Sequence, residues 1–392
     1  ATVYINGEKA GEHGGGFLPF LVDITDKARY GEENRITVKV NNELTETNIP
    51  CGRTIRLRNG RKMSKPYFDF YNYSGLQRSV HLLSIPPRSI EDIDLRYEIS
   101  GNDASVLYSV RTKGDGDIRL TLIDADGDTA AEAEGKDGTM IVRDAHLWQV
   151  RNAYLYTLRI TLSEDGKLLD TYEMPIGIRT VRIEGEDILI NGSPVYLKGF
   201  GKHEDSDIVG RGFSIGVMKR DFELMKWIGA NSFRTSHYPY DEEIYRMADR
   251  EGFLIIDEVP AVGLFESLVN FLDAGTGKGA SSFFAKETTP LLLKAHINAV
   301  DEMIARDKNP PSVIAWSLLN EPESKDEHSV PYFTKVFNAA RRLDPEKRPC
   351  TFAMEVSSGP DTCRCYHFCD FIELNRYYGW YIKGGYEISD AE

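Results

Sequence analysis

Short runs in which apolar and polar residues alternate fill the first half of the chain. Every second position is apolar over 36–40, 118–122 and 158–162, and the last run leads into the turn-forming pair Asp165-Gly166. A period of two predicts half-buried strands of antiparallel sheets. Pro86-Pro87 interrupts the pattern, so we expect one β domain over residues 1–86 and a β-sandwich of about one hundred residues over 87–178.

The pattern changes near Arg179, where strand-like apolar runs begin to alternate with segments of helical period. Six βα units of this kind predict a (β/α)8 TIM barrel over 179–392 that lacks its last two units. An open doubly wound sheet has the same local rhythm and stays as an alternative. The predicted strands lie at 195–199, 231–235, 253–257, 312–319, 350–354 and 371–374. The first two helices are predicted by apolar stripes, one with Met218, Phe222, Met225 and Ile228, the other with Ile244, Met247 and Ala248 before Gly252.

The composition is that of a soluble globular protein with more than one domain: 392 residues, of which 41% are apolar and 28% charged. A formal net charge of −14 opposes binding to nucleic acid or anionic membranes, because both require a positive field. No run approaches the roughly 20 apolar residues of a membrane span, and no signal peptide is visible. We therefore expect no nucleic acid and no membrane as partners. Residues 1–7 have the pattern of a strand and its turn, so we expect the true N-terminus to be missing.

Cysteine usage points to a reducing compartment. The chain has five cysteines, an odd number, and four of them lie between Cys350 and Cys369. Their spacing does not match the paired CxxC pattern of zinc sites. We expect free thiols, with a metal site or a disulfide as the alternatives.

The segment Trp316–Pro322 contains the clearest candidate for chemistry. Its apolar strand ends in Asn320 and Glu321, at the edge where barrel enzymes place their catalytic groups. Cleavage of a glycosidic bond needs a carboxylic acid that protonates the leaving oxygen, and partial burial keeps such a carboxyl protonated near neutrality. Glu321 is therefore our candidate acid, and Asn320 would hold the sugar hydroxyl next to the reacting carbon. A loop or helix-capping role is the alternative.

Other predicted strands end in polar and aromatic residues at the same rim. His203 follows the first strand and His237 the second; neutral imidazoles can bind sugar hydroxyls, although a structural role is the competing interpretation. The aromatic run 375–381 follows the sixth strand and would either stack on sugars or pack in a core or interface. Asp257 and Glu258 close the third strand, and we expect them to form ion pairs across the rim.

A stretch rich in Gly and Ser, 263–289, follows the third strand. In a barrel, a long loop at this edge overhangs the mouth of the active site. A disordered insertion without contact to substrate is the alternative.

Several stretches together resemble glycoside hydrolase family 2, and within it the bacterial β-glucuronidases. The run 375–381 is the most specific to glucuronidases, whereas Asn320-Glu321-Pro322 is shared with other members of the family. The remaining matches lie at 41–44, 67–75, 146–148, 227–232 and 304–309. Because they span nearly the whole chain in the order of the family, chance is a poor explanation.

The resemblance implies a jelly-roll, sugar-binding-like domain over 1–86, an immunoglobulin-like sandwich over 87–178 and a catalytic barrel over 179–392. It makes Glu321 the acid/base and Asn320 its neighbour on the sugar. Residues 263–289 would correspond to the loop that covers the aglycone in some gut bacterial members. The resemblance implies no metal and no organic cofactor. It also implies a homo-oligomer, commonly a tetramer, in the cytoplasm of a bacterium. The remaining sugar contacts that it implies are Asp69, His237, Asn375, Tyr377 and Tyr381, together with His203, which follows by position only.

Two parts of the family's pattern have no match in the chain. The nucleophilic glutamate and the Asn-x-Lys motif that binds the sugar carboxylate lie beyond the sixth strand in the family, and Glu387 and Glu392 have no strand context. We expect the intact enzyme to hydrolyse glucuronide conjugates, that is β-D-glucuronides. It would remove the terminal sugar and retain the configuration of its reacting carbon. We expect this chain alone to be inactive. The alternatives are another exo-glycosidase of family 2, such as a β-galactosidase, and a non-catalytic glycan-binding protein.

Overall fold

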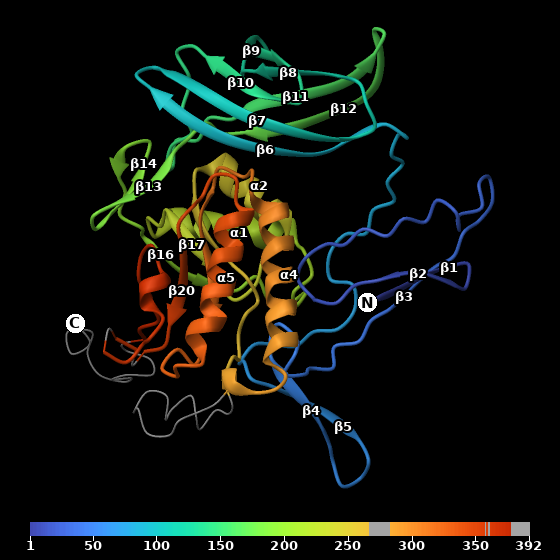
Figure 1. Cartoon of the computed structure of the whole chain (residues 1–392), viewed down its shortest axis with the longest axis vertical. Coiled ribbons are helices and arrows are strands. Elements are labelled where there is room, and N and C mark those ends of the chain that lie inside the picture. Colours follow the sequence, from blue (N-terminus) through green and yellow to red (C-terminus); the bar gives the residue numbers. More distant parts are fainter. Residues whose placement is uncertain (266–282, 357, 360, 378–392) are drawn as a thin grey trace.

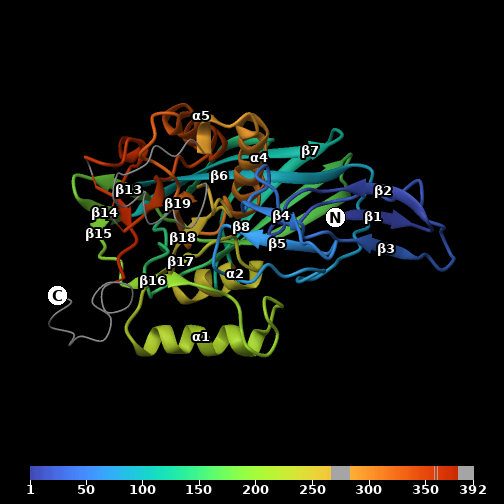
Figure 2. The ribbon, with the colours of Figure 1, turned by 90° about the horizontal axis from the view of Figure 1, so that it is seen from below.

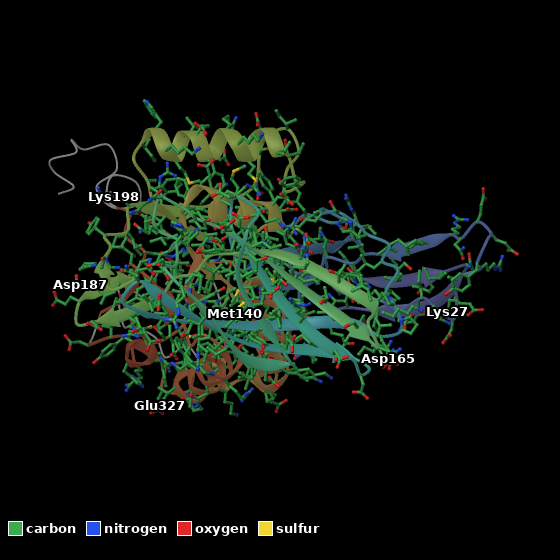
Figure 3. The ribbon with its side chains drawn as sticks, turned by 90° about the horizontal axis from the view of Figure 1, so that it is seen from above. Lys27, Met140, Asp165, Asp187, Lys198 and Glu327 are labelled. Atoms are coloured by element: carbon green, nitrogen blue, oxygen red, sulfur yellow. The ribbon has the colours of Figure 1, made fainter. Side chains whose placement is uncertain are left out.

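The computed structural model describes residues 1–265, 283–356, 358–359 and 361–377. Three regions follow one another along the chain, and each is a separate body of strands or of strands and helices in Figure 1. In Figure 1 the long antiparallel strands form the upper end, the parallel strands with their helices lie below them, and the N-terminal strands extend to the right of the parallel strands. In the view from above, Lys27 and Asp187 lie near opposite sides of the molecule, and Met140 lies over its middle (Figure 3).

The N-terminal region is a small sheet followed by a hairpin. Strands β1 (Thr2–Ile5), β2 (Glu8–Glu12) and β3 (Ile36–Lys39) pair in the order β2-β1-β3. The turn between β1 and β2 is Asn6-Gly7, and both residues have a positive φ, 51° and 90°. Such a turn matches the twist of a hairpin and favours Asn-Gly. Strands β4 (Gly52–Arg56) and β5 (Lys62–Pro66) pair only with each other.

The second region is a sandwich of two antiparallel sheets. One sheet has the order β10-β7-β6, with β6 (Ser89–Ser100), β7 (Asp103–Lys113) and β10 (Asp137–Val142). The other has the order β12-β11-β8-β9, with β8 (Asp117–Ile123), β9 (Thr129–Glu134), β11 (Tyr156–Glu164) and β12 (Lys167–Ile176). The inward residues of both sheets form one core, for example Val106, Leu120 and Leu158, which are fully buried. The alternation at 118–122 and 158–162 thus places every second side chain in a shared interior.

The third region begins with a short sheet, β13 (Val181–Glu184), β14 (Asp187–Ile190) and β15 (Ser193–Pro194), and continues as a six-stranded parallel sheet. Its strands are β16 (Gly199–Lys202), β17 (Ser232–Thr235), β18 (Leu254–Glu258), β19 (Val313–Asn320), β20 (Cys350–Met354) and β21 (Glu373–Leu374). They are neighbours in the order of the sequence, without a reversal. A doubly wound sheet reverses its strand order, so this sheet is the larger part of a barrel.

Within the described ranges, four helices accompany the parallel strands: α1 (Ile215–Trp227), α2 (Glu242–Glu251), α4 (Thr289–Asp307) and α5 (Ser329–Leu343). From below, α1 lies along one outer side of the strands (Figure 2). It buries Met218, Phe222 and Met225 as predicted, but Ile228 caps the helix and is 57% exposed. In α2, the Asp241 side chain accepts a hydrogen bond from the second helical N–H, and Gly252 ends the helix in the left-handed region. No helix among the described residues is long and apolar enough to span a membrane.

One predicted strand was misplaced. Residues 195–197 are an apolar run, yet the first barrel strand begins only at Gly199. The run lies beside β14 instead, since the Val195 N–H donates to the Ile188 oxygen at 2.9 Å. At Gly199 the strands β16 and β17 approach so closely that a Cβ would lie 1.9 Å from the backbone oxygen of Ser232, a spacing that only glycine permits.

The sandwich and the barrel are joined through Arg179, which is 2% exposed. Its guanidinium donates to both carboxylate oxygens of Glu346, at 2.7 and 2.9 Å, and to the backbone oxygens of Pro311 and Val313 at 3.0 and 2.9 Å. A bidentate pair of this kind fixes orientation as well as charge. Nearby, the Trp148 indole donates to the backbone oxygen of Asp249 at 2.8 Å.

We expect Arg179→Ala to lower the free energy of unfolding by about 1–3 kcal/mol, because it leaves the backbone oxygens of Pro311 and Val313 without their buried donor, whereas Glu346 still pairs with Arg348 at 2.6 Å. Urea unfolding followed by tryptophan fluorescence measures the loss. Arg182→Ala, at an exposed position three residues later, is the matched control and should change stability little. Equal effects of the two substitutions would contradict the assignment.

Candidate active site

Glu321 directly follows β19, in which every residue is buried. The strand is held on both sides at this point: the Asn320 N–H donates to the Ala261 oxygen at 3.0 Å, and the Glu321 N–H donates to the Ala353 oxygen at 2.8 Å. Glu321 has a φ of 47°, in the left-handed region that residues other than glycine rarely adopt. Such backbone outliers gather at functional sites, where the surrounding structure holds them in place.

Asn375 connects the two candidate residues of this strand. Its side-chain amide donates to Glu321 Oε1 at 2.6 Å and to Asn320 Oδ1 at 3.0 Å. Asn375 follows β21, 54 residues away from Glu321 in the sequence. The fold therefore brings together three of the predicted site residues, and they form one hydrogen-bonded group.

Arg234 lies beneath this group and orients it. Its guanidinium donates to Asn375 Oδ1 at 3.2 Å and to Asn320 Oδ1 at 3.4 Å. It also donates to Glu373 Oε1 at 2.6 Å, and its Nε lies 3.2 Å from Glu258 Oε2. Buried carboxylates need a cation of this kind. Arg234 and Glu373 were not among the predicted site residues, because neither ends a motif in the sequence. The available signal was the position of Arg234, three residues before His237.

Asp257 and Glu258, at the end of β18, have different partners. Glu258 is fully buried and contacts His237 Nδ1 at 2.7 Å in addition to Arg234. Burial opposes its ionisation, but Arg234 and His237 outweigh burial and lower the pKa of Glu258. Asp257 accepts hydrogen bonds from Thr235 and Tyr245 at 3.0 and 2.6 Å. Burial, reinforced by the charge of Asp307, raises the pKa of Asp257 well above its ordinary value. The expected ion pairs across the rim are thus present for Glu258.

Glu321 itself has the electrostatic character of an acid. Burial raises the pKa of its carboxyl, and the hydrogen bond from Asn375 opposes that shift without cancelling it. The nearby charge of Glu355 acts in the same direction as burial, whereas His237 and Arg234 favour the carboxylate. A carboxyl that keeps its proton closer to neutral pH can deliver it to a leaving oxygen.

The two histidines lie side by side at the rim, with ring centroids 5.4 Å apart. Phe70, from the N-terminal region, contacts both, at 5.8 Å from His203 and 6.0 Å from His237. Burial and His237 lower the pKa of His203, and the carboxylate of Asp69 opposes the shift. Asp69 is exposed and close enough to act on His203. The N-terminal region therefore reaches the mouth of the barrel, where Asp69 was predicted.

Two arginines fasten that region to the barrel. The guanidinium of Arg211 lies 4.8 Å from the Phe17 ring centre, 5.3 Å from that of Tyr73 and 4.2 Å from that of Tyr238. Arg78 donates to Glu204 at 2.5 Å and to the Phe17 and Pro239 oxygens at 2.7 and 3.0 Å. Stacking of arginine on aromatic faces stabilises such contacts when water is excluded.

Tyr377, the next predicted site residue after Asn375, is 36% exposed at the end of the described chain. Tyr381 lies outside the described residues, as does most of the predicted loop 263–289, of which 266–282 are not described. Of the predicted site residues, the structure thus brings Glu321, Asn320 and Asn375 into one group, with His203, His237 and Asp69 at the adjoining rim.

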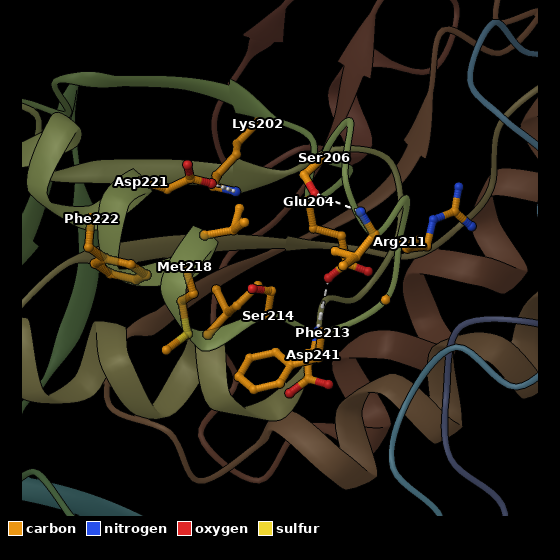
Figure 4. Close-up of a pocket in the computed structure, with 14 residues that line it drawn as sticks. Lys202, Glu204, Ser206, Arg211, Phe213, Ser214, Met218, Asp221, Phe222 and Asp241 are labelled. Carbon is orange, nitrogen blue, oxygen red and sulfur yellow. Dashed lines mark hydrogen bonds and ion pairs between the residues drawn. The ribbon is translucent and has the colours of Figure 1, made fainter.

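A recess with about 420 Å³ of empty volume lies between α1 and the loop after β16 (Figure 4). The Lys202 ammonium pairs with Asp221 there at 2.9 Å, and Glu204 accepts from the Asp241 N–H at 3.1 Å. No predicted site residue lines it. A second, shallow recess has Glu321 in its wall, together with Glu355 and Lys325.

A metal site can be tested on the same residues. Where the chain is described, there is no group of three or more His, Cys, Asp or Glu side chains placed to hold a metal ion. All five cysteines are described as free thiols, and four of them are buried.

Two family models match the sequence of the chain, and one of them covers the parallel sheet with Glu321 and the adjoining amides. Residues 181–388 match the model of glycosyl hydrolases family 2, TIM barrel domain, and residues 88–179 match a second model, glycosyl hydrolases family 2. The first match covers more than half of the chain. The chain therefore belongs to glycosyl hydrolase family 2.

Within that family, the chain is similar to β-glucuronidases. It is 45% identical to the β-glucuronidase of Paenibacillus borealis, in an alignment that covers 98% of the chain and 64% of the relative. It is 38% identical to the β-glucuronidase of Homo sapiens, with 98% of the chain and 59% of the relative covered. The solved β-glucuronidase of Ruminococcus gnavus has a TM-score of 0.96 and 57% identity, covering 100% of this chain and 65% of that one. A structure of the R. gnavus protein in complex with uronic isofagomine has the same values. The chain thus spans just under two thirds of the length of its bacterial relatives.

We expect Asn375→Ala to raise the pKa of the Glu321 carboxyl further, because the lost hydrogen bond favours the carboxylate. A water-soluble carbodiimide modifies protonated carboxyls, so labelling of the Glu321 peptide should persist to higher pH in the variant, as mass spectrometry would show. Asn34→Ala, at an exposed and remote position, is the control. A labelling profile that does not move would mean that Asn375 does not set the acidity of Glu321.

Proposed function

We propose that the protein of which this chain is part is a retaining β-glucuronidase, which removes glucuronic acid from the end of β-D-glucuronides. The observation that carries the proposal is the raised pKa of Glu321 within the hydrogen-bonded group of Asn320 and Asn375. The names of the relatives and the uronic isofagomine bound to the R. gnavus protein support the choice of sugar. Hydrolysis of a 4-nitrophenyl β-glucuronide but not of the matched β-galactoside tests it against the other family 2 activities.

In the proposed reaction, Glu321 protonates the glycosidic oxygen and the aglycone leaves. A second carboxylate forms the glycosyl-enzyme, and Glu321 then takes a proton from the water that hydrolyses it. Retaining cleavage places the two carboxyl groups about 5–5.5 Å apart. Glu258 and Glu373 are both committed to Arg234, so we assign the nucleophile to a segment of the longer protein.

The sugar would lie between the Glu321 group and the histidine rim. Asn320 would bind the hydroxyl next to the reacting carbon, where its hydrogen bond strengthens as charge develops. Asp69, His203 and His237 would bind other hydroxyls, and Asn375, Tyr377 and Tyr381 would line the pocket. The chemistry requires protons and carboxylates only, so no cofactor or metal is proposed.

The same proposal covers the rest of the architecture. We assign a jelly-roll domain to 1–86, an immunoglobulin-like sandwich to 87–178 and the barrel to 179–392, with two further βα units closing the sheet between β21 and β16. The exposed side chains Phe200, Leu224 and Trp227 on β16 and α1 are 46%, 51% and 83% exposed, which favours further packing on this side. A homo-oligomer, such as a tetramer, in a bacterial cytoplasm is consistent with the five free thiols.

In the intact enzyme, Glu321→Gln should lower kcat/KM by roughly 10²–10⁴-fold, because the amide cannot donate the proton that the leaving oxygen needs. The loss should be smaller for 4-nitrophenyl glucuronide than for an alkyl glucuronide, whose leaving group needs more help. Steady-state kinetics on both substrates measure this, with circular dichroism as the control for folding. Equal losses on the two substrates would rule out the acid role.

Asp69→Ala should weaken binding of the transition state by about 1.5–3 kcal/mol, the value of a charged hydrogen bond, and leave the thermal transition nearly unchanged because Asp69 is exposed. The measurement is kcat/KM together with differential scanning fluorimetry. Asp26→Ala, in the same region but exposed and remote from the rim, is the matched control. A large fall in melting temperature with unchanged kcat/KM would reverse the interpretation.

A further inference from the structure

The hairpin formed by β4 and β5, residues 52–66, concentrates positive charge in a chain whose net charge is −14. It contains six lysines and arginines and no aspartate or glutamate. All six are exposed. Protein surfaces normally mix charges of both signs, so a projecting element with one sign only indicates an anionic partner. The six cations are Arg53, Arg56, Arg58, Arg61, Lys62 and Lys65.

The pairing of the two strands places like charges opposite each other. Arg53 is the cross-strand partner of Lys65, and Arg56 is the partner of Lys62. Like charges at directly opposite positions destabilise a sheet, whereas opposite charges stabilise it. Within the described ranges, Lys62 is the only one of the six cations that forms an ion pair, with Glu43 at 2.7 Å. The hairpin therefore keeps a charge arrangement that lowers its own stability, and such local conflicts are found at functional sites.

The base of the hairpin is fixed beside the end of β19. The Cys51 N–H donates to the Val262 oxygen at 2.9 Å, and the preceding oxygen, that of Ala261, accepts from the Asn320 N–H at 3.0 Å. The base and the residue before Glu321 are thus bound to adjacent residues of one segment. From this base the hairpin extends away from the body of the molecule (Figure 1). The charged ribbon therefore begins at the barrel rim and projects into solvent.

The cations are distributed along the ribbon. Three residues separate the Arg53–Lys65 pair from the Arg56–Lys62 pair, which is about 10 Å along a strand, and two more arginines follow in the turn. This distribution suits an extended chain of anionic groups better than one small anion. Residues 52–66 include no aromatic side chain on which nucleic acid bases or the rings of a neutral glycan could stack.

We propose that the β4–β5 hairpin binds an extended polyanionic polysaccharide, a glycan chain whose sugars carry carboxylates or sulfates. The inference goes beyond the proposed function, because binding at the hairpin breaks no bond and uses none of the residues assigned to the sugar site. The hairpin holds the polymer close to the barrel rim. Its local positive field also offsets the repulsion that a net charge of −14 exerts on a polyanion.

The test uses the full-length protein and three polymers: heparin, which carries sulfates and carboxylates, polygalacturonate, which carries carboxylates only, and neutral dextran. Affinity electrophoresis in gels that contain each polymer measures the dissociation constant without turnover. The wild type should be retarded by an anionic polymer and not by dextran. Retardation by heparin alone assigns sulfate as the group bound, and retardation by polygalacturonate assigns carboxylate. Binding should weaken as the salt concentration rises.

The double variant Arg58→Gln/Arg61→Gln removes two cations from the turn without touching the paired strands. It should weaken polyanion binding by about fivefold, as expected for the loss of two exposed ion pairs. The matched control is Lys167→Gln/Arg182→Gln, which removes the same charge at exposed positions of other regions. The control should bind the polymer as the wild type does.

Lys65→Glu separates binding from folding. It places a carboxylate opposite Arg53, so the hairpin should be at least as stable as in the wild type, while polyanion binding should fall by about tenfold. Differential scanning fluorimetry measures the first effect and affinity electrophoresis the second. The value of kcat/KM on 4-nitrophenyl β-glucuronide should not change, so this proposal and the proposed function are tested by different measurements.

Four results would overturn the proposal. One is a wild type that no anionic polymer retards, and another is an equal loss of binding in the turn variant and in its control. The third is equally tight binding of double-stranded DNA of similar length, which would mean that the hairpin does not select glycans. The fourth is a changed sedimentation coefficient of the turn variant, which would make the hairpin a contact between subunits.

Discussion

The buried guanidinium of Arg234 is the interaction on which the arrangement of the barrel rim depends. It ties β17 to β18 through Glu258, to β21 through Glu373, and to the end of β19 through Asn320. Removing two carboxylates from water costs several kcal/mol for each ion, and the cost is offset only when a cation and further hydrogen bonds are held in good geometry. Ser317 supplies such bonds, donating to Glu258 at 2.7 Å and to Glu373 at 3.2 Å. The ends of four parallel strands are thus fixed by one charge cluster.

The position and the acidity of Glu321 follow from this cluster, although its contact with the cluster passes through an amide. Arg234 donates to the side-chain oxygen of Asn375, and this hydrogen bond fixes the orientation of the amide. The amide nitrogen is then left to donate to Asn320 and Glu321. Burial raises the pKa of the acid and the amide limits the rise. The same residues therefore hold the acid in place and keep its pKa from rising as far as burial alone would take it.

Local physics explains why much of the fold could be predicted from the sequence. Strand alternation, the Asn6-Gly7 and Asp165-Gly166 turns and the caps of α2 depend on neighbouring residues. Because parallel strands end at one rim, the residues after them could also be predicted to meet. The Arg234–Glu373 pair could not be predicted, since 139 residues separate its members and no local sequence pattern marks either of them. The first barrel strand was misplaced for a related reason, because the apolar run before it lies beside β14, where the Val195 N–H donates to the Ile188 oxygen at 2.9 Å.

Charge also indicates where the proposed uronate preference must originate. The chain has a net charge of −14, so an anionic sugar needs a local cation. In the described part of the rim, Arg234 is committed to carboxylates and amides, and Arg78 to Glu204 and backbone oxygens. Arg211 is surrounded by aromatic rings and Lys202 is paired with Asp221. To bind the sugar carboxylate, Arg234, Arg78 and Lys202 would have to give up a carboxylate partner, and Arg211 would have to give up its stacking on aromatic rings, so recognition of the uronate by them is disfavoured. We therefore propose that the cation for this role, like the nucleophile, lies outside the described residues.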